Sequence, residues 1–122
     1  MINLKEGRYI VDFGPIGVSG NEELERSWLI SAQHIFQMFC SKQKDYGPEN
    51  IARGGELGVV VRAQDKVARL QNLQGKDPDY EPIEDTWLDL ADYGIIGYMV
   101  NRGWWPKSME GPKVCPSCGK GE

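Results

Sequence analysis

Between Asp77 and Asp92 the chain has seven acidic residues and no basic one. Asp85, Asp89 and Asp92 are spaced three and four residues apart, which places them on one face of a helix. Glu81 lies one turn earlier. Like charges at this spacing destabilise a helix, and a hard cation such as Mg²⁺ or Mn²⁺ would offset that cost. The pattern favours a metal site, and a solvated acidic helix face is the alternative.

The preceding segment carries cations at helical spacing. Its polar residues recur three and four positions apart, and they are Arg62, Asp65, Lys66, Arg69 and Asn72. Guanidinium and ammonium groups bind phosphate oxygens, and Asp65 could add a metal ligand. A phosphate site that faces the carboxylates is one interpretation. The other is that the cations only pair with those carboxylates across a bundle.

A third polar cluster surrounds the turn at Gly47. Lys42 and Tyr46 precede this turn, and Asn50 follows it. Tyr46 could stack on a base, and Asn50 could form hydrogen bonds with the edge of the base. Together with Asn72, these two residues are the candidates for base binding. Alternatively, the cluster only ends a helix.

Two of the three cysteines, Cys115 and Cys118, form a Cys-x-x-Cys followed by glycine, which is typical of half a zinc site. Structural zinc takes four ligands, so Cys40 and His34 or a second subunit would have to complete it. A reduced pair and a redox role are the alternatives. An odd number of cysteines argues against a disulfide framework.

The elements that would position these groups are helices. Apolar periodicity and Gly/Pro stops predict helices over about 21–44, 56–73 and 82–102, with a short helical piece from 48 that Gly54-Gly55 interrupts. Residues 1–20 are expected to form an extended arm with strand character only over 9–13. Residues 21–104 would form the domain, and 105–122 a tail. We expect an all-α bundle of three to four helices completed by oligomerisation, because three helices leave apolar stripes exposed.

Composition excludes several classes of protein. A chain of 122 residues suits one domain, and its longest apolar stretch, Tyr93–Val100, is too short to cross a bilayer. The first residues do not resemble a secretion signal, so a cytoplasmic protein with no membrane partner is expected. The net charge of −4 argues against duplex nucleic acid as the bulk partner.

Three motifs carry a family resemblance. They are Lys42-x-x-Asp45-Tyr46-Gly47-x-x-Asn50, Gly58-x-x-x-Arg62-x-x-Asp65-Lys66-x-x-Arg69-Leu70-x-Asn72-Leu73, and Glu81-x-x-x-Asp85-Thr86-x-x-Asp89-Leu90-x-x-Tyr93. Over residues 22–103 the chain resembles the nucleotide modification associated domain of the first type, a phage and bacterial family. That family is similar to the all-α nucleoside triphosphate pyrophosphohydrolases of the MazG and dimeric dUTPase type, in which carboxylates on facing helices hold Mg²⁺ against the phosphates of a nucleotide.

The resemblance implies a function and roles for residues. Its implied metal ligands are Asp65, Glu81, Asp85 and Asp89, and its implied phosphate contacts are Lys42, Arg62, Lys66 and Arg69. We therefore expect Mg²⁺-dependent (or Mn²⁺-dependent) hydrolysis of a nucleoside or deoxynucleoside triphosphate, in phage-associated nucleotide metabolism.

Two other functions are also considered. MazG-type enzymes carry Glu-Glu-x-x-Glu on an early helix, whereas the nearest string in this chain is Glu22-Glu23-Leu24-Glu25. One alternative is therefore a nucleotide-binding protein without turnover, which sequesters a signalling nucleotide or supports base modification. The other is a protein-interaction module that docks its partner through Trp104, Trp105 and the tail.

Overall fold

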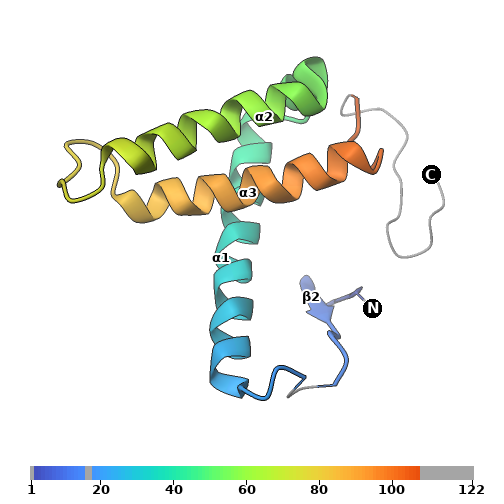
Figure 1. Ribbon diagram of the computed structural model, residues 1–122. Coiled ribbons are helices and arrows are strands. Elements are labelled where there is room, and N and C mark those ends of the chain that lie inside the picture. Colours follow the sequence, from blue (N-terminus) through green and yellow to red (C-terminus); the bar gives the residue numbers. More distant parts are fainter. Residues whose placement is uncertain (1, 16–17, 108–122) are drawn as a thin grey trace.

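The computed structural model describes residues 2–15 and 18–107 of the chain. This part is mostly helical, with a small antiparallel hairpin at its N-terminal end (Figure 1). The elements are β1 (Ile2–Lys5), β2 (Arg8–Val11), α1 (Glu22–Tyr46), α2 (Glu49–Asn72) and α3 (Ile83–Asn101). None of the helices in the described residues is long and apolar enough to cross a membrane.

Helices α2 and α3 lie side by side and run in opposite directions, joined by a loop at one end (Figure 1). Helix α1 crosses them with its C-terminal half, and its N-terminal half extends away from both (Figure 1). The C-terminal half of α1 is therefore the part that reaches the other two helices.

Local capping sets the ends of α1 close to the predicted positions. The side chain of Asn21 accepts a hydrogen bond of 3.0 Å from the backbone N–H of Leu24, as an N-cap does. The helix ends at Gly47, whose φ of 70° lies in the left-handed region that favours glycine. The backbone N–H of Gly47 donates to the carbonyl oxygen of Gln43 at 2.9 Å.

The predicted short helical piece and the second helix form one element, α2, with a sharp kink. Gly55 has φ 62° and ψ −160°, a conformation that is essentially restricted to glycine. The interruption predicted at Gly54-Gly55 is therefore confirmed, and it bends the path of α2 between its first turn and its main body.

The N-terminal arm contains more regular structure than predicted. Strand β1 pairs with β2 in the register Ile2↔Val11, whereas strand character was expected only over residues 9–13. Glu6 and Gly7 have φ values of 52° and 74°, as the two loop residues of a type I′ turn require. The overlooked signal is this Glu-Gly pair between two apolar segments.

The core lies between α2 and α3 and is small. Ile51, Val59 and Ile96 form its buried cluster, against which Phe39, Tyr93, Val100 and Trp105 pack, and Leu70 is buried outside this cluster. The indole N–H of Trp105 donates to the carbonyl oxygen of Pro48 at 2.8 Å, so the first residue of the predicted tail is attached to the domain. Cys115 and Cys118 lie outside the described residues.

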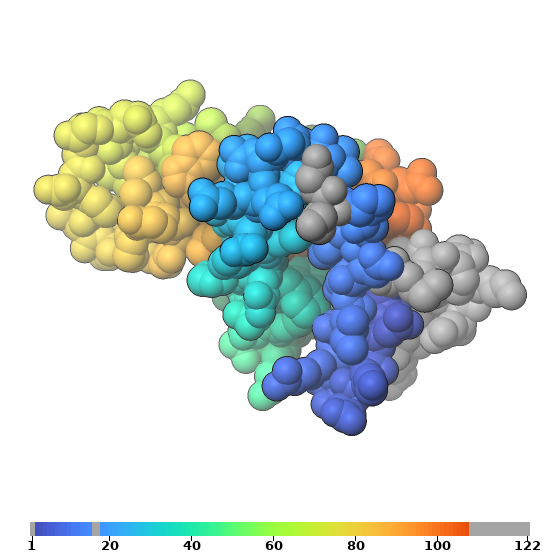
Figure 2. Space-filling view, turned by 90° about the horizontal axis from the view of Figure 1, so that it is seen from below, coloured from blue at the N-terminus to red at the C-terminus, as the bar shows by residue number. Residues whose placement is uncertain are grey.

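Helix α1 leaves large apolar side chains on the surface. It has 25 residues, none of which is buried, and Trp28 near its N-terminal end is 68% exposed. The hairpin covers part of it, because the rings of Tyr9 and Phe36 meet edge to face at 5.7 Å. Figure 2 shows the N-terminal end of α1 toward the viewer, with the hairpin beside it.

Candidate functional site

Asp89 is the residue at which the three helices meet. One carboxylate oxygen, Oδ1, lies 2.6 Å from Nζ of Lys42 on α1, and Oδ2 lies 2.9 Å from Nζ of Lys66 on α2. Asp89 itself is on α3 and only 8% exposed. A buried carboxylate is tolerated when it is paired in this way, so this ion-pair triad fixes α1, α2 and α3 relative to one another.

The charges at this junction shift one another's pKa values. Burial would raise the pKa of Asp89, but the hydrogen bonds and charges of Lys42 and Lys66 hold it below its usual value. Burial likewise opposes the charged form of Lys42, yet its hydrogen bond to Asp89 keeps the pKa of the ammonium above its usual value. Both groups are therefore charged at neutral pH.

Asp92, one turn further along α3, has the opposite behaviour. It is only 4% exposed, and burial raises its pKa to about 6. The charge of Lys42 lowers the pKa and that of Asp89 raises it, but burial is the larger effect. Asp92 is thus a carboxylate that the fold keeps in an unfavourable environment.

These residues surround a polar cavity, which we call the three-helix pocket. Its volume of about 350 Å³ lies within the range of small-molecule sites. Its lining consists of Lys42, Gln43 and Tyr46 from α1, Asn50, Ile51, Arg62 and Lys66 from α2, Glu81 from the preceding loop, and Asp89, Asp92, Tyr93 and Ile96 from α3.

Three of the four predicted phosphate contacts line this pocket: Lys42, Arg62 and Lys66. The fourth, Arg69, is used elsewhere. Its guanidinium donates to the hydroxyl of Thr86 and, at 2.6 Å, to the backbone carbonyl oxygen of Glu81. Arg69 therefore ties the start of α3 and its preceding loop to α2.

The predicted metal ligands are divided between the pocket and the surface. Glu81 and Asp89 line the pocket, whereas Asp65 and Asp85 are exposed and lie outside its lining. In residues 2–15 and 18–107, no group of three acidic, histidine or cysteine side chains could hold a metal ion. Mg²⁺ is commonly held, however, by one or two carboxylates together with substrate phosphates. The described residues therefore do not form an all-protein metal cage, and Glu81 and Asp89 are the two predicted ligands that share the pocket.

The predicted base contacts are divided as well. Tyr46 and Asn50 line the pocket, and Tyr46 is 70% exposed, so its ring is accessible to a flat ligand. Asn72 is exposed at the end of α2 and is not in the lining. Gln43 and Tyr93 were missed as site residues. Two signals in the sequence could have identified them: Tyr93 is the last residue of the third motif, and Gln43 is adjacent to Lys42.

Three oxygens of the pocket residues lack hydrogen-bond donors. Oε1 of Gln43, Oδ1 of Asn50 and Oδ1 of Asp92 are buried, and no donor in the described part of the chain reaches them. Buried polar atoms in native proteins are nearly always paired. These three are therefore the most unusual polar feature of the pocket.

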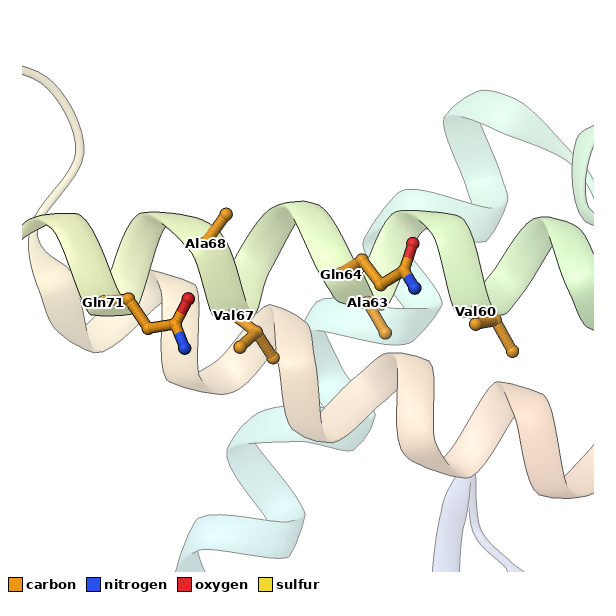
Figure 3. Close-up of a pocket in the computed structure, with 6 residues that line it drawn as sticks. All are labelled: Val60, Ala63, Gln64, Val67, Ala68 and Gln71. Atoms are coloured by element: carbon orange, nitrogen blue, oxygen red, sulfur yellow. The ribbon is translucent and has the colours of Figure 1, made fainter.

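A second, apolar groove lies on α2 alone (Figure 3). Its volume is about 420 Å³, and it is lined by Val60, Ala63, Gln64, Val67, Ala68 and Gln71. It lacks charged residues, so it has the character of a packing surface.

Comparison of the chain with family models, with curated proteins and with solved structures gives no match. The family resemblance carried by the three motifs therefore stays a prediction.

Proposed function

We propose that this protein binds a nucleotide in the three-helix pocket. The observation that carries the proposal is that Lys42, Arg62 and Lys66, from two different helices, line one polar cavity together with two tyrosines. Ammonium and guanidinium groups bind phosphate oxygens, and tyrosine rings stack on bases. The resemblance of the three sequence motifs to a nucleotide-associated family supports the same conclusion.

Asp89 organises the pocket for a phosphate. By holding Lys42 and Lys66 at 2.6 and 2.9 Å, it keeps two ammonium groups in the lining of the pocket before any ligand is present. Cations held in place lose less side-chain entropy when a ligand binds. The carboxylates of the pocket also limit its net charge, which favours a nucleotide accompanied by a divalent cation over a bare polyphosphate.

Hydrolysis of the nucleotide is the second candidate function, and the observation that favours it is that Glu81 and Asp89 share the pocket with the cations. Both oxygens of Asp89 are already paired with Lys42 and Lys66, so Glu81 together with the phosphates of the nucleotide would hold the Mg²⁺ or Mn²⁺. When bound, such an ion supplies polarisation of the phosphate oxygens. Lys42 and Lys66 would balance the charge that develops on a leaving pyrophosphate.

The first test is binding of nucleoside mono-, di-, tri- and cyclic phosphates, each with and without Mg²⁺, followed by chromatography of the mixture. Arg62→Ala is the informative variant, because Lys42 and Lys66 also hold Asp89. It should weaken triphosphate binding about 10-fold or more, since hydrogen bonds between charged groups contribute roughly 1.5–3 kcal/mol.

Arg53→Ala is the matched control, because Arg53 is on the same helix and is highly exposed outside the pocket. Equal losses in both variants, or no binding of any nucleotide by the wild type, would contradict the proposal. Release of pyrophosphate that requires Mg²⁺ would establish hydrolysis, and binding without product would establish a nucleotide-binding protein.

We also propose that a second copy of the chain covers the apolar surfaces. Among the described residues, Trp28 on α1 and Val67 in the groove on α2 remain exposed, and the buried core is small. A domain with so little buried apolar area needs a partner that is present whenever it folds. Another copy of the same chain meets that requirement.

A further inference from the structure

Gln43, Asn50 and Asp92 form a group of hydrogen-bond acceptors, one from each helix, within the three-helix pocket. Asp92 is more buried than Asp89, with only 4% of its surface exposed. Its Oδ1, together with the side-chain carbonyl oxygens of Gln43 and Asn50, receives no hydrogen bond from the described residues.

Unpaired buried acceptors are costly, and a ligand that supplies donors removes the cost. A metal ion is a poor candidate for this role, because the ammonium of Lys42 is near enough to act on Asp92 electrostatically. A neutral group with several N–H donors satisfies the oxygens without adding positive charge beside Lys42. The unpaired oxygens therefore point to an N–H-rich ligand edge.

We propose, building on nucleotide binding in this pocket, that Gln43, Asn50 and Asp92 read the donor edge of the base, and that the preferred base is guanine. The Watson–Crick edge of guanine presents three N–H hydrogens, whereas those of adenine and cytosine present two and that of uracil one. Three unpaired acceptors match the guanine edge best. A carboxylate also accepts adjacent N–H groups as a pair.

The remaining lining suits the flat faces of a base. Tyr46 and Tyr93 provide aromatic rings, and Ile51 and Ile96 provide apolar contact. Lys42 and Lys66 lie in the same cavity, so one ligand can contact the acceptors with its base and the cations with its phosphates. The pocket thus has a separate set of residues for each part of a nucleotide.

The test is the binding affinity of the full chain for GTP, ITP, ATP, CTP and UTP with Mg²⁺, measured by calorimetry. ITP is the matched ligand, because inosine differs from guanosine only by loss of the 2-amino group. GTP should bind about 10-fold more tightly than ITP, and UTP should be among the weakest, because a missing donor leaves a buried acceptor unpaired.

Asp92→Asn should bring the affinities for GTP and ITP to within about threefold of each other, because an amide accepts fewer N–H groups than a carboxylate. Glu84→Gln, an acid-to-amide change at an exposed site on α3, should leave the wild-type preference intact. Equal binding of all five triphosphates by the wild type would overturn the base assignment alone. Absence of binding of every nucleotide would overturn the proposed function as well. A guanine preference that persists in Asp92→Asn would show that Asp92 does not read the base.

Discussion

Asp89 accepts from Lys42 and Lys66 with its two oxygens, so each lysine depends on the same carboxylate. Replacing Asp89 with Asn would leave two ammonium groups close together with no counter-charge between them. We expect Asp89→Asn to lower the free energy of unfolding by about 2 kcal/mol, a value reduced because both lysines are partly exposed.

Urea denaturation at pH 7 would measure this effect, with Asp79→Asn in the exposed loop before α3 as the control. If the two variants are equally stable, Asp89 does not hold the three helices together.

Asp92 makes an opposite contribution to stability. Burial raises its folded-state pKa to about 6, whereas an unfolded aspartate titrates near 3.9. The folded protein therefore binds the proton more tightly, and stability falls as pH rises from about 4 to about 6. The asparagine side chain of the Asp92→Asn variant does not titrate. The free energy of unfolding of this variant should therefore rise relative to that of the wild type as the pH increases across this range.

The measurement is the free energy of unfolding of both proteins at pH values from 4 to 7.5. Asp89, whose pKa is lowered, loses its contribution at acidic pH in both proteins, so the difference between them reports mainly on Asp92. A difference that is constant with pH would mean that Asp92 titrates normally.

At the scale of elements, α2 depends on a backbone conformation at Gly55 that other residues rarely adopt. A Cβ added at Gly55 or at Gly54 would meet nothing within 4 Å, so side-chain contacts do not distinguish the two sites. Of the two glycines, only Gly55 has a positive φ. Gly55→Ala should therefore lower the free energy of unfolding by about 1–2 kcal/mol.

Gly54→Ala provides the matched control, because alanine favours a helix and should raise stability by up to about 1 kcal/mol. Thermal unfolding of both variants would show the opposite signs. Two shifts of the same sign would contradict the kink at Gly55.

The kink illustrates how much of the element scale follows from local residues. Asn21, Gly47 and the Gly54-Gly55 pair act through their own backbone or the nearest turn, so they indicated helix ends and the break in α2 without knowledge of the fold. The hairpin also has a local signal in Glu6-Gly7, but glutamate is an uncommon residue at positive φ. Its turn was for that reason missed.

For the whole molecule, the exposed apolar surfaces predict self-association. The protein should elute as a dimer or larger assembly in size-exclusion chromatography with light scattering, and its Tm should rise with protein concentration. Trp28→Glu should shift the mass toward that of a monomer, because it places a charge on an apolar side of α1.

Gln37→Glu adds the same charge on the opposite side of α1, nine residues further along, and should not change the mass. A wild-type protein that is monomeric at all concentrations would refute the self-association prediction.

The sequence by itself determined which residues share a helix face and where each helix begins and ends, because both depend on interactions within a few residues. It placed Arg62 and Arg69 on one stripe and Asp85 and Asp92 on another. Only the tertiary structure decided that Arg62 and Asp92 line the three-helix pocket while Arg69 and Asp85 do not. Helical periodicity determines only the direction in which a side chain points around the axis of its own helix. Which turns meet is determined by the crossing of α1 and α3, and that crossing depends on contacts between residues far apart in the chain.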